Sequence, residues 1–215
     1  MPNKREIRRL AFDVRAAENR EHGTHLVGLP IVYGQVIQYG WRREVIDPGA
    51  VDENTDLTDV PFLIGHNTSM VPLARSRNYN ENSTMQLKRV ENGLEIRVDL
   101  DTENNQDAKK LYSAVKRGDI TGMSFMFTVD KSNWEEEDSD NPLRRIVHID
   151  KVFEVSAVAF PAYDETKLQA AGKDPTLESD EDPLESALKR ELQEVRDAKH
   201  NNERRRNALD ILRRV

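Results

Sequence analysis

Three residues in separate apolar segments have side chains that could perform chemistry together. His66 directly follows an apolar segment, Ser124 lies among small and apolar neighbours, and Glu154 interrupts the apolar segment 152–158. A serine hydroxyl stays protonated at neutral pH, so it attacks a carbonyl only when a base takes its proton. That base is normally a histidine oriented by a third group. The three residue types therefore fit nucleophilic catalysis by a serine.

Each of these residues also has a structural interpretation. His66 could bond to backbone at a strand edge beside a turn, Ser124 could be an ordinary strand serine, and Glu154 could lie on an exposed face. A carboxylate inside an apolar strand is costly unless it is paired, which makes Glu154 a candidate partner for a histidine. Spacing alone does not choose between the two interpretations.

The sequence gives little reason to expect a metal or a cofactor. It contains no cysteine, so a zinc site would need histidine and carboxylate ligands. The five histidines show no His-Glu-x-x-His or similar paired spacing. The lack of cysteine also excludes disulfides, which fits a reducing cytosol. We therefore expect neither a metal nor a cofactor.

Composition and charge set broader limits. The 215 residues suffice for one domain of ordinary size plus an appendage, and 33% of them are charged, which predicts that part of the chain lies outside a core. A net charge of −7 argues against nucleic acid as a partner. The N-terminal residues lead into no long apolar segment, and nothing approaches the roughly 18 apolar residues of a membrane helix. We expect no signal peptide and no membrane contact.

The elements that must position the three residues are mostly short β-strands between residues 6 and about 165. An Asn-Gly turn at 91–93 predicts a hairpin, and the pattern of 105–117, followed by Gly118, predicts one helix. The expected strands are 7–14, 85–90, 94–100, 123–129, 145–149 and 152–160, the last buried on both faces. The sequence thus predicts a mainly β protein with a few helices (α+β), folded as a closed or nearly closed β-barrel.

The C-terminal part has a different character. We expect a barrel domain over 1–171, an acidic, proline-containing linker over 172–183, and a charged helical tail over 184–215. Segment 182–185 has the acidic cap, proline and glutamate of a helix start, and the tail carries a net charge of +3. An apolar stripe is formed by Leu184, Leu188, Leu192 and Val195. The tail is an arm for a partner, a segment to be removed, or a helix packed on its own barrel.

Six motifs, in order, resemble those of the prohead (capsid maturation) serine proteases of tailed phages with the HK97-type head. They are segments 44–51, 63–67, 72–75, 92–94, 117–125 and 153–162. Val51 stands where the family has Phe, and Ala74 where it has Gly. The resemblance covers roughly residues 10 to 170, and its strength comes from the order of the motifs rather than from any one of them.

The resemblance implies roles for specific residues. Ser124 corresponds to the nucleophile, His66 to the general base, and Glu154 to the group that orients His66. The family is similar in fold to the herpesvirus assembly proteases, which use a second histidine, so His148 is the alternative to Glu154. The same similarity implies a herpesvirus-protease-like β-barrel.

Two other serines are rival nucleophiles, Ser69 and Ser156. Backbone N–H groups near Ser124 are the expected oxyanion donors, with Arg75 as a candidate for charge assistance.

The implied activity is that of a serine endopeptidase in phage head maturation. Its expected substrates are scaffolding segments of the major capsid protein, or a separate scaffold protein, and the protease itself. These proteins would be its partners, with self-association as a further option. The expected location is the assembling prohead in the host cytoplasm, after which the protease stays associated with the virion or is lost on maturation. The alternatives are a catalytically inactive scaffolding component of the prohead and a small-ligand-binding β-barrel.

Overall fold

The computed structural model describes residues 5–10, 14–19, 23–77, 82–159 and 183–212. Within these residues the protein is mainly β, with two α-helices, α1 (Gln106–Arg117) and α3 (Pro183–Leu212). The strands are β1 (Arg5–Leu10), β2 (Arg15–Asn19), β3 (Gly23–Val32), β4 (Ile37–Tyr39), β5 (Arg42–Ile46), β6 (Asp59–Ile64), β7 (Ala74–Arg77), β8 (Met85–Val90), β9 (Gly93–Asp99), β10 (Gly122–Glu135) and β11 (Leu143–Val158). The mainly β, α+β class predicted from sequence is confirmed.

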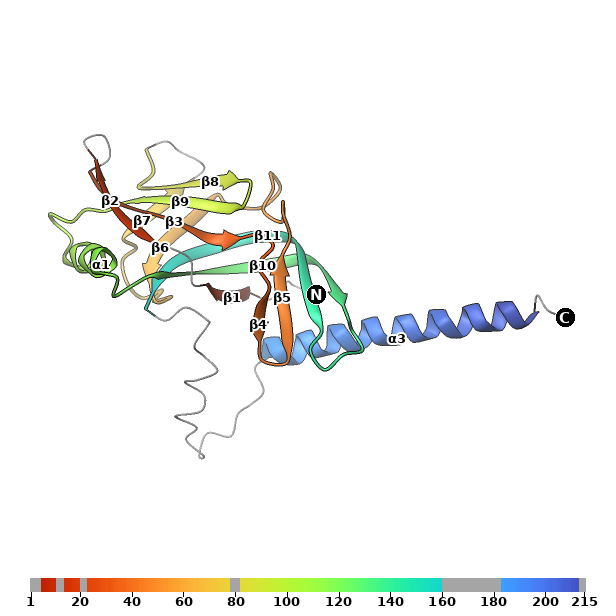
Figure 1. The fold of residues 1–215 in the computed structure, drawn as a ribbon. Helices are drawn as coiled ribbons and strands as arrows, with labels where there is room; N and C mark the ends of the chain where they lie inside the picture. Colours follow the sequence, from red (N-terminus) through yellow and green to blue (C-terminus); the bar gives the residue numbers. More distant parts are fainter. Residues whose placement is uncertain (1–4, 11–13, 20–22, 78–81, 160–182, 213–215) are drawn as a thin grey trace, which may run out of the picture.

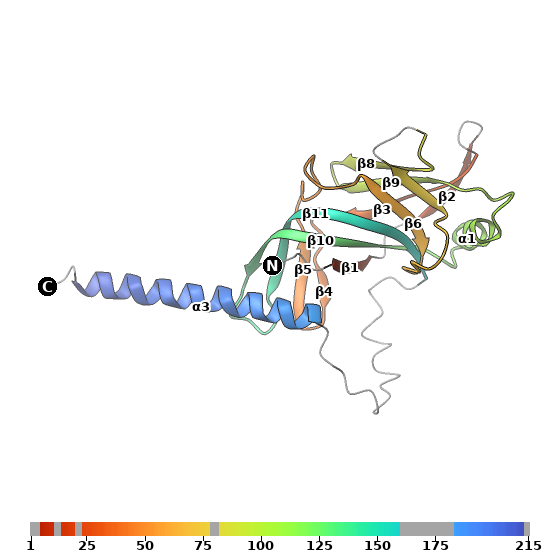
Figure 2. The same ribbon diagram turned by 180° about the vertical axis from the view of Figure 1, so that it is seen from behind.

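The strands form two sheets (Figures 1 and 2). The larger sheet has the order β1-β10-β11-β5-β4, and β6 and β7 extend it from a second part of β11. Strand β10 pairs antiparallel along β11, whereas β5 and β6 pair parallel with opposite ends of β11. The smaller sheet has the order β2-β3-β9-β8. Strand β11 is therefore the element through which the larger sheet is assembled.

The predicted closed barrel is wrong for the part of the chain that the structure describes, because its strands form two sheets that no strand pairing joins. The sheets come close at β7 and β8, but side chains take the place of a backbone ladder there. The backbone N–H groups of Arg75 and Arg77 donate to the hydroxyls of Thr84 and Ser83, at 2.9 and 3.0 Å. Hydroxyl acceptors satisfy these two donors, so no backbone ladder joins β7 to β8.

The hairpin predicted at 91–93 is confirmed, since β8 and β9 pair antiparallel across it. The two strands expected at 145–149 and 152–160 are instead one strand, β11. Asp150 and Lys151, which lie between the two expected ranges, are polar, but both side chains have partners beside the strand. The Thr128 hydroxyl donates to Asp150 at 3.2 Å, and Lys151 pairs with Asp56. The pairing of β10 with β11 shifts register in this region, and β11 continues through it as one strand.

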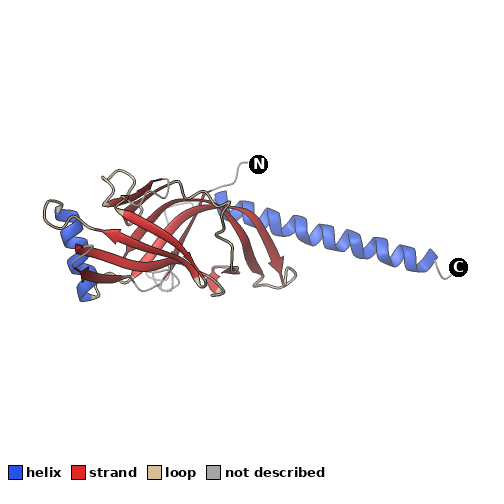
Figure 3. Cartoon of the chain, turned by 90° about the horizontal axis from the view of Figure 1, so that it is seen from above, coloured by secondary structure: helices blue, strands red, loops and turns tan. Residues whose placement is uncertain are grey.

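Apolar residues of both sheets and of α1 belong to one buried cluster. The predicted helix is confirmed as α1, whose buried face contributes Ala108 and Leu111. The side chain of Asn105 caps its start, and Gly118, with φ of 81°, ends it in the left-handed conformation. Helix α1 lies at one end of the body, while α3 leaves from the other (Figures 1 and 3).

The first half of α3 packs on the larger sheet. Leu188 and Leu192 are buried against Trp134, which stacks on Trp41 with ring centroids 5.8 Å apart. The predicted apolar stripe is thus the docking face of α3. Because residues 160–182 lie outside the described part of the chain, the linker and the division into domains stay predictions. Among the described helices, none combines the length and apolar character that crossing a membrane requires.

Polar contacts fix the position of α3 along the sheet. Glu185 accepts hydrogen bonds from the buried Arg42 guanidinium at 2.7 and 2.8 Å and from Trp41 Nε1 at 2.7 Å. Glu191 accepts from Trp134 Nε1 at 3.0 Å, and Lys199 pairs with Glu137 at 2.8 Å. Hydrogen bonds to charged groups are directional, so they define one position of α3 on the sheet more closely than apolar packing alone does.

We expect Leu188→Ala to loosen α3 from the body. Leu188 is only 2% exposed, so its truncation removes apolar contact and should lower the free energy of α3 opening by about 2–3 kcal/mol. Amide hydrogen exchange would show faster exchange in α3 and unchanged protection in β10 and β11. Glu194→Ala, on the exposed face of the same helix, is the control and should change the opening free energy by no more than about 0.5 kcal/mol. Unchanged protection of α3 in Leu188→Ala would contradict the docking.

A buried ion cluster connects β1 to the rest of the larger sheet. Arg144 contacts Glu6 Oε2 at 2.8 Å and Glu44 Oε2 at 3.3 Å, and all three side chains are at most 5% exposed. These residues lie far apart in the chain, in β1, β5 and β11, and no sequence pattern predicted that they would meet. The cluster holds β1 alongside β10, the strand that carries Ser124.

Candidate active site

His66 follows β6 in a backbone conformation that is unusual for a side-chain-bearing residue. Its φ is 61°, and Gly65 before it has φ of 60°. A non-glycine residue held in this region costs about 1–3 kcal/mol, so surrounding contacts must hold it. The N–H of Gly65 donates to Ala157 O and the N–H of His66 donates to Ser156 Oγ, both at 3.0 Å. The predicted position at a strand edge next to a turn is confirmed, and β11 holds it there.

Glu154 is the partner of the His66 ring. Its side chain is 2% exposed, so the interpretation that it lies on a solvent-exposed face is wrong. Its Oε1 lies 2.5 Å from His66 Nδ1. Because a carboxylate accepts hydrogen bonds, Nδ1 is the donor in this contact, and in the neutral form of the ring the lone pair lies on Nε2.

Ser124 lies on the same face of the sheet as this pair. It is directly opposite Ser156 in the β10–β11 ladder, and Met126 is opposite Glu154. Directly opposite residues of an antiparallel pair point to one face with Cβ atoms about 5 Å apart, and residues two apart on a strand share that face. The fold therefore gathers Ser124, Ser156 and Glu154 on the face where the His66 side chain is bonded.

The free side of the His66 ring has the properties of a base. Nε2 is buried and has no hydrogen-bond partner among the described residues. A buried nitrogen lone pair with its opposite nitrogen fixed by a carboxylate is ready to accept a proton. Ser124 is itself fully buried, so a peptide reaches its hydroxyl only after neighbouring groups move.

His148 lies in a different cluster. It is six residues before Glu154 on β11, about 20 Å of extended strand. Its Nδ1 lies 2.5 Å from Asp130 Oδ1, and its Nε2 lies 3.1 Å from Asp52 Oδ1. Both ring nitrogens are thus occupied by carboxylates, and the contact with His66 is made by Glu154 instead.

The two carboxylates change the titration of His148. Burial of the ring opposes its positive form, but the hydrogen bonds to Asp130 and Asp52 outweigh burial and raise the pKa of His148 above its usual value. The pKa of Asp52 is lowered, mainly by the backbone N–H of Asn54 and then by His148.

We expect His148 to make stability depend on pH. Since its pKa is higher in the folded protein than the value of about 6.5 in the unfolded chain, its contribution is full below about pH 6.5 and is lost as pH rises through the folded pKa. Urea unfolding of the wild type and of His148→Gln, from about pH 5 to pH 9, would show the difference between them shrinking as pH rises. A difference that grew with pH would contradict the assignment.

The remaining candidates have other surroundings. Ser69 is exposed in the loop after β6. Ser156 is fully buried, and its hydroxyl donates to Glu154 Oε2 at 2.6 Å. Arg75 makes a two-point contact with Asp59, at 2.6 Å for each bond. The link from Ser156 to Glu154 was not predicted, although two residues spaced by two on a strand share a face.

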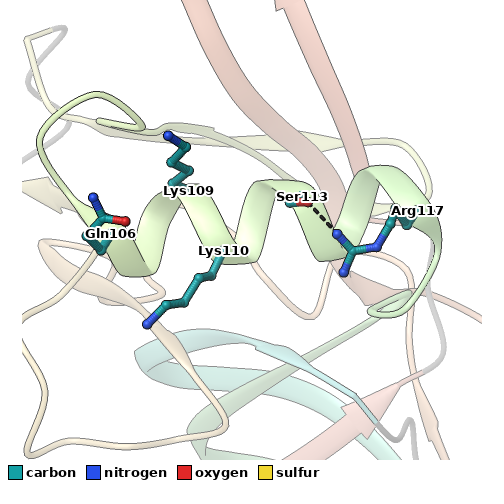
Figure 4. A pocket seen from close by; sticks show the side chains of 5 residues that line it. All are labelled: Gln106, Lys109, Lys110, Ser113 and Arg117. Atoms are coloured by element: carbon teal, nitrogen blue, oxygen red, sulfur yellow. Dashed lines mark hydrogen bonds between the residues drawn. The ribbon is translucent and has the colours of Figure 1, made fainter.

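A surface pocket on α1 is separate from this cluster (Figure 4). Its lining residues are Gln106, Lys109, Lys110, Ser113 and Arg117. It contains none of the candidate catalytic residues. Across the described part of the chain, no group of three or more histidine and carboxylate side chains has the arrangement of a metal site.

Comparison with known proteins addresses the family directly. The chain matches the family described as Caudovirus prohead serine protease over residues 11–179. Neither the curated proteins nor the solved structures gave a match. The matched region includes the segments of His66, Ser124 and Glu154 and covers well over half of the chain. The chain therefore belongs to the caudovirus prohead serine protease family.

Proposed function

We propose that this protein is the serine endopeptidase of phage head maturation, with Ser124 as nucleophile, His66 as general base and Glu154 as the residue that orients His66. The observation that supports this most directly is the 2.5 Å contact between His66 Nδ1 and Glu154 Oε1, on the sheet face that carries Ser124. Membership of a family of serine proteases supports the same assignment.

The reaction follows from the arrangement. His66 Nε2 takes the proton of the Ser124 hydroxyl as its oxygen attacks the peptide carbonyl, and Glu154 stabilises the resulting positive ring. The ring then gives this proton to the leaving amine as the peptide C–N bond breaks and an acyl-enzyme remains. Water, deprotonated by the same nitrogen, attacks the ester and releases the second fragment.

The substrates that we propose are scaffolding segments of the major capsid protein, or a separate scaffold protein, and the protease itself. The family description supports a role in the prohead, and the proposed site of the reaction is the assembling shell in the host cytoplasm. Confinement there brings enzyme and substrate to high local concentration, so modest intrinsic affinity suffices.

The chemical part of the proposal is tested by labelling. A fluorophosphonate, which reacts with activated serine hydroxyls, should modify the wild-type protein, and peptide mass mapping should place the adduct on Ser124. An adduct on Ser69 or Ser156 would contradict the assignment of the nucleophile.

The substrate part is tested by co-expression with the major capsid protein of the same phage. N-terminal sequencing of the products should show that capsid protein has lost an N-terminal segment and that the protease has become shorter. Closed shells that contain only full-length proteins would contradict the proposal and favour an inactive scaffolding component.

A further inference from the structure

We infer that Ser156 is a positioning residue, whose hydroxyl holds Glu154 and His66 in their reactive arrangement. This inference rests on the proposed function of His66 and Ser124. It assigns to Ser156 a role other than that of nucleophile, and one that the match to the family does not state.

The first part of the argument is the use of the Ser156 hydroxyl. Its proton is donated to Glu154 Oε2 at 2.6 Å, and its oxygen accepts the backbone N–H of His66 at 3.0 Å. A hydroxyl whose proton points to a carboxylate and whose oxygen is engaged by an amide is poorly placed to attack a peptide. The bond from the His66 N–H links β11 to the segment after β6, whereas the bond to Glu154 lies within β11.

The second part concerns the carboxylate. Glu154 is buried, and its two oxygens have different partners, with Oε1 at His66 Nδ1 and Oε2 at Ser156. The bond from Ser156 therefore sets the rotation of the carboxylate about its last torsion, which is otherwise a broad one. Loss of that bond leaves a buried oxygen without its donor, so the carboxylate would turn or admit water at the expense of its aim at Nδ1.

The third part concerns the backbone of His66. A residue with φ of 61° keeps that conformation only where its surroundings hold it. The bond from the His66 N–H to Ser156 is one of these restraints, and the bond from Gly65 to Ala157 is the neighbouring one. Ser156 thus acts on both ends of His66, on its main chain directly and on its ring through Glu154.

The experiment compares two variants of the same shape. Ser156→Thr keeps the hydroxyl, whereas Ser156→Val replaces it with a methyl group and adds the same bulk. Ser156→Ala is the third variant, and Ser76→Ala, at a buried serine of β7, is the matched control. The substrate is a synthetic peptide spanning the capsid site that N-terminal sequencing identifies.

We expect Ser156→Val and Ser156→Ala to lower kcat about 10- to 100-fold with KM within about twofold, because small displacements of reacting groups cost about this much. Ser156→Thr should recover most of kcat, and Ser76→Ala should leave it unchanged. Equal loss in Thr and Val would show that bulk rather than the hydroxyl matters and would overturn the inference. The Thr and Val pair decides even if the alanine variant fails to fold.

A second measurement does not depend on activity. The proton between His66 Nδ1 and Glu154 should give a far-downfield NMR signal, assigned by its absence in His66→Asn. The signal should persist in Ser156→Thr and be lost or broadened in Ser156→Val. A signal unchanged in Ser156→Val would overturn the positioning role. If no variant and no wild type cleaves peptide or labels at Ser124, the proposed function fails, while the NMR comparison still decides the role of Ser156.

Discussion

Ser124→Ala should abolish cleavage of the co-expressed capsid protein and of the protease itself. Without the Ser124 oxygen no acyl-enzyme forms, so the rate should fall by roughly 10⁴-fold or more. The substitution removes one oxygen atom at a buried position, so unfolding in urea should change by no more than about 1–2 kcal/mol. Gel analysis of the products, with N-terminal sequencing of any fragments, is the measurement.

Two further variants make this result specific to the proposed pair. Ser69→Ala, at the exposed rival serine, should cleave at the wild-type rate. Adding His66→Ala to Ser124→Ala should cause little additional loss, because residues that act in one step are not additive. Processing by Ser124→Ala at a rate near that of the wild type would remove Ser124 as the nucleophile.

Arg144→Met should have the largest effect on stability. Glu6 and Glu44 are at most 5% exposed, and Arg144 is the cation that lies between them. Its removal leaves two buried carboxylates close together, which should cost about 3–5 kcal/mol in urea unfolding. Because Glu6 anchors β1, hydrogen exchange in β1 should also become faster.

The adjacent residue provides the control. Arg145 pairs with Asp47 and Glu135 at partly exposed positions, where water weakens ion pairs, so Arg145→Met should cost no more than about 1 kcal/mol. Replacing all three buried residues together, as Glu6→Leu, Glu44→Leu and Arg144→Met, should recover most of the loss. A similar cost for Arg144→Met and Arg145→Met would contradict the importance of the buried cluster.

Local patterns predicted some parts of this fold well. The hairpin at 91–93, helix α1 and the apolar stripe of α3 follow from turn chemistry, capping and helical periodicity, all of which act within a few residues. The gap expected between strands 145–149 and 152–160 was wrong. The polar side chains of Asp150 and Lys151 have partners that are distant in sequence, so the strand continues through them. The closed barrel was wrong for the part of the chain that the structure describes, because strand content does not determine whether two sheets join.

In the candidate site, too, some features follow from local sequence and others depend on residues distant in the chain. The apolar segment 152–158 marks Glu154 as unusual in a buried strand, but only the pairing of β6 with β11 brings His66 to it. The choice between Glu154 and His148 depends on which carboxylates surround each histidine, and these come from separate segments of the chain. The left-handed backbone of His66 and its bond to Ser156 have no counterpart in local sequence patterns.

Helix α3 is much longer than the part of it that packs on the larger sheet. At about 1.5 Å per residue its 30 residues span about 45 Å, and the contacts described above end at Lys199. About 20 Å of helix therefore extends beyond Lys199, away from the body (Figure 1). A rigid rod, unlike a flexible linker, keeps a fixed offset and direction between what holds its tip and the sheet. A sideways force at the tip would load the bonds between Glu185 and Arg42, at the far end of the docked half, as a torque.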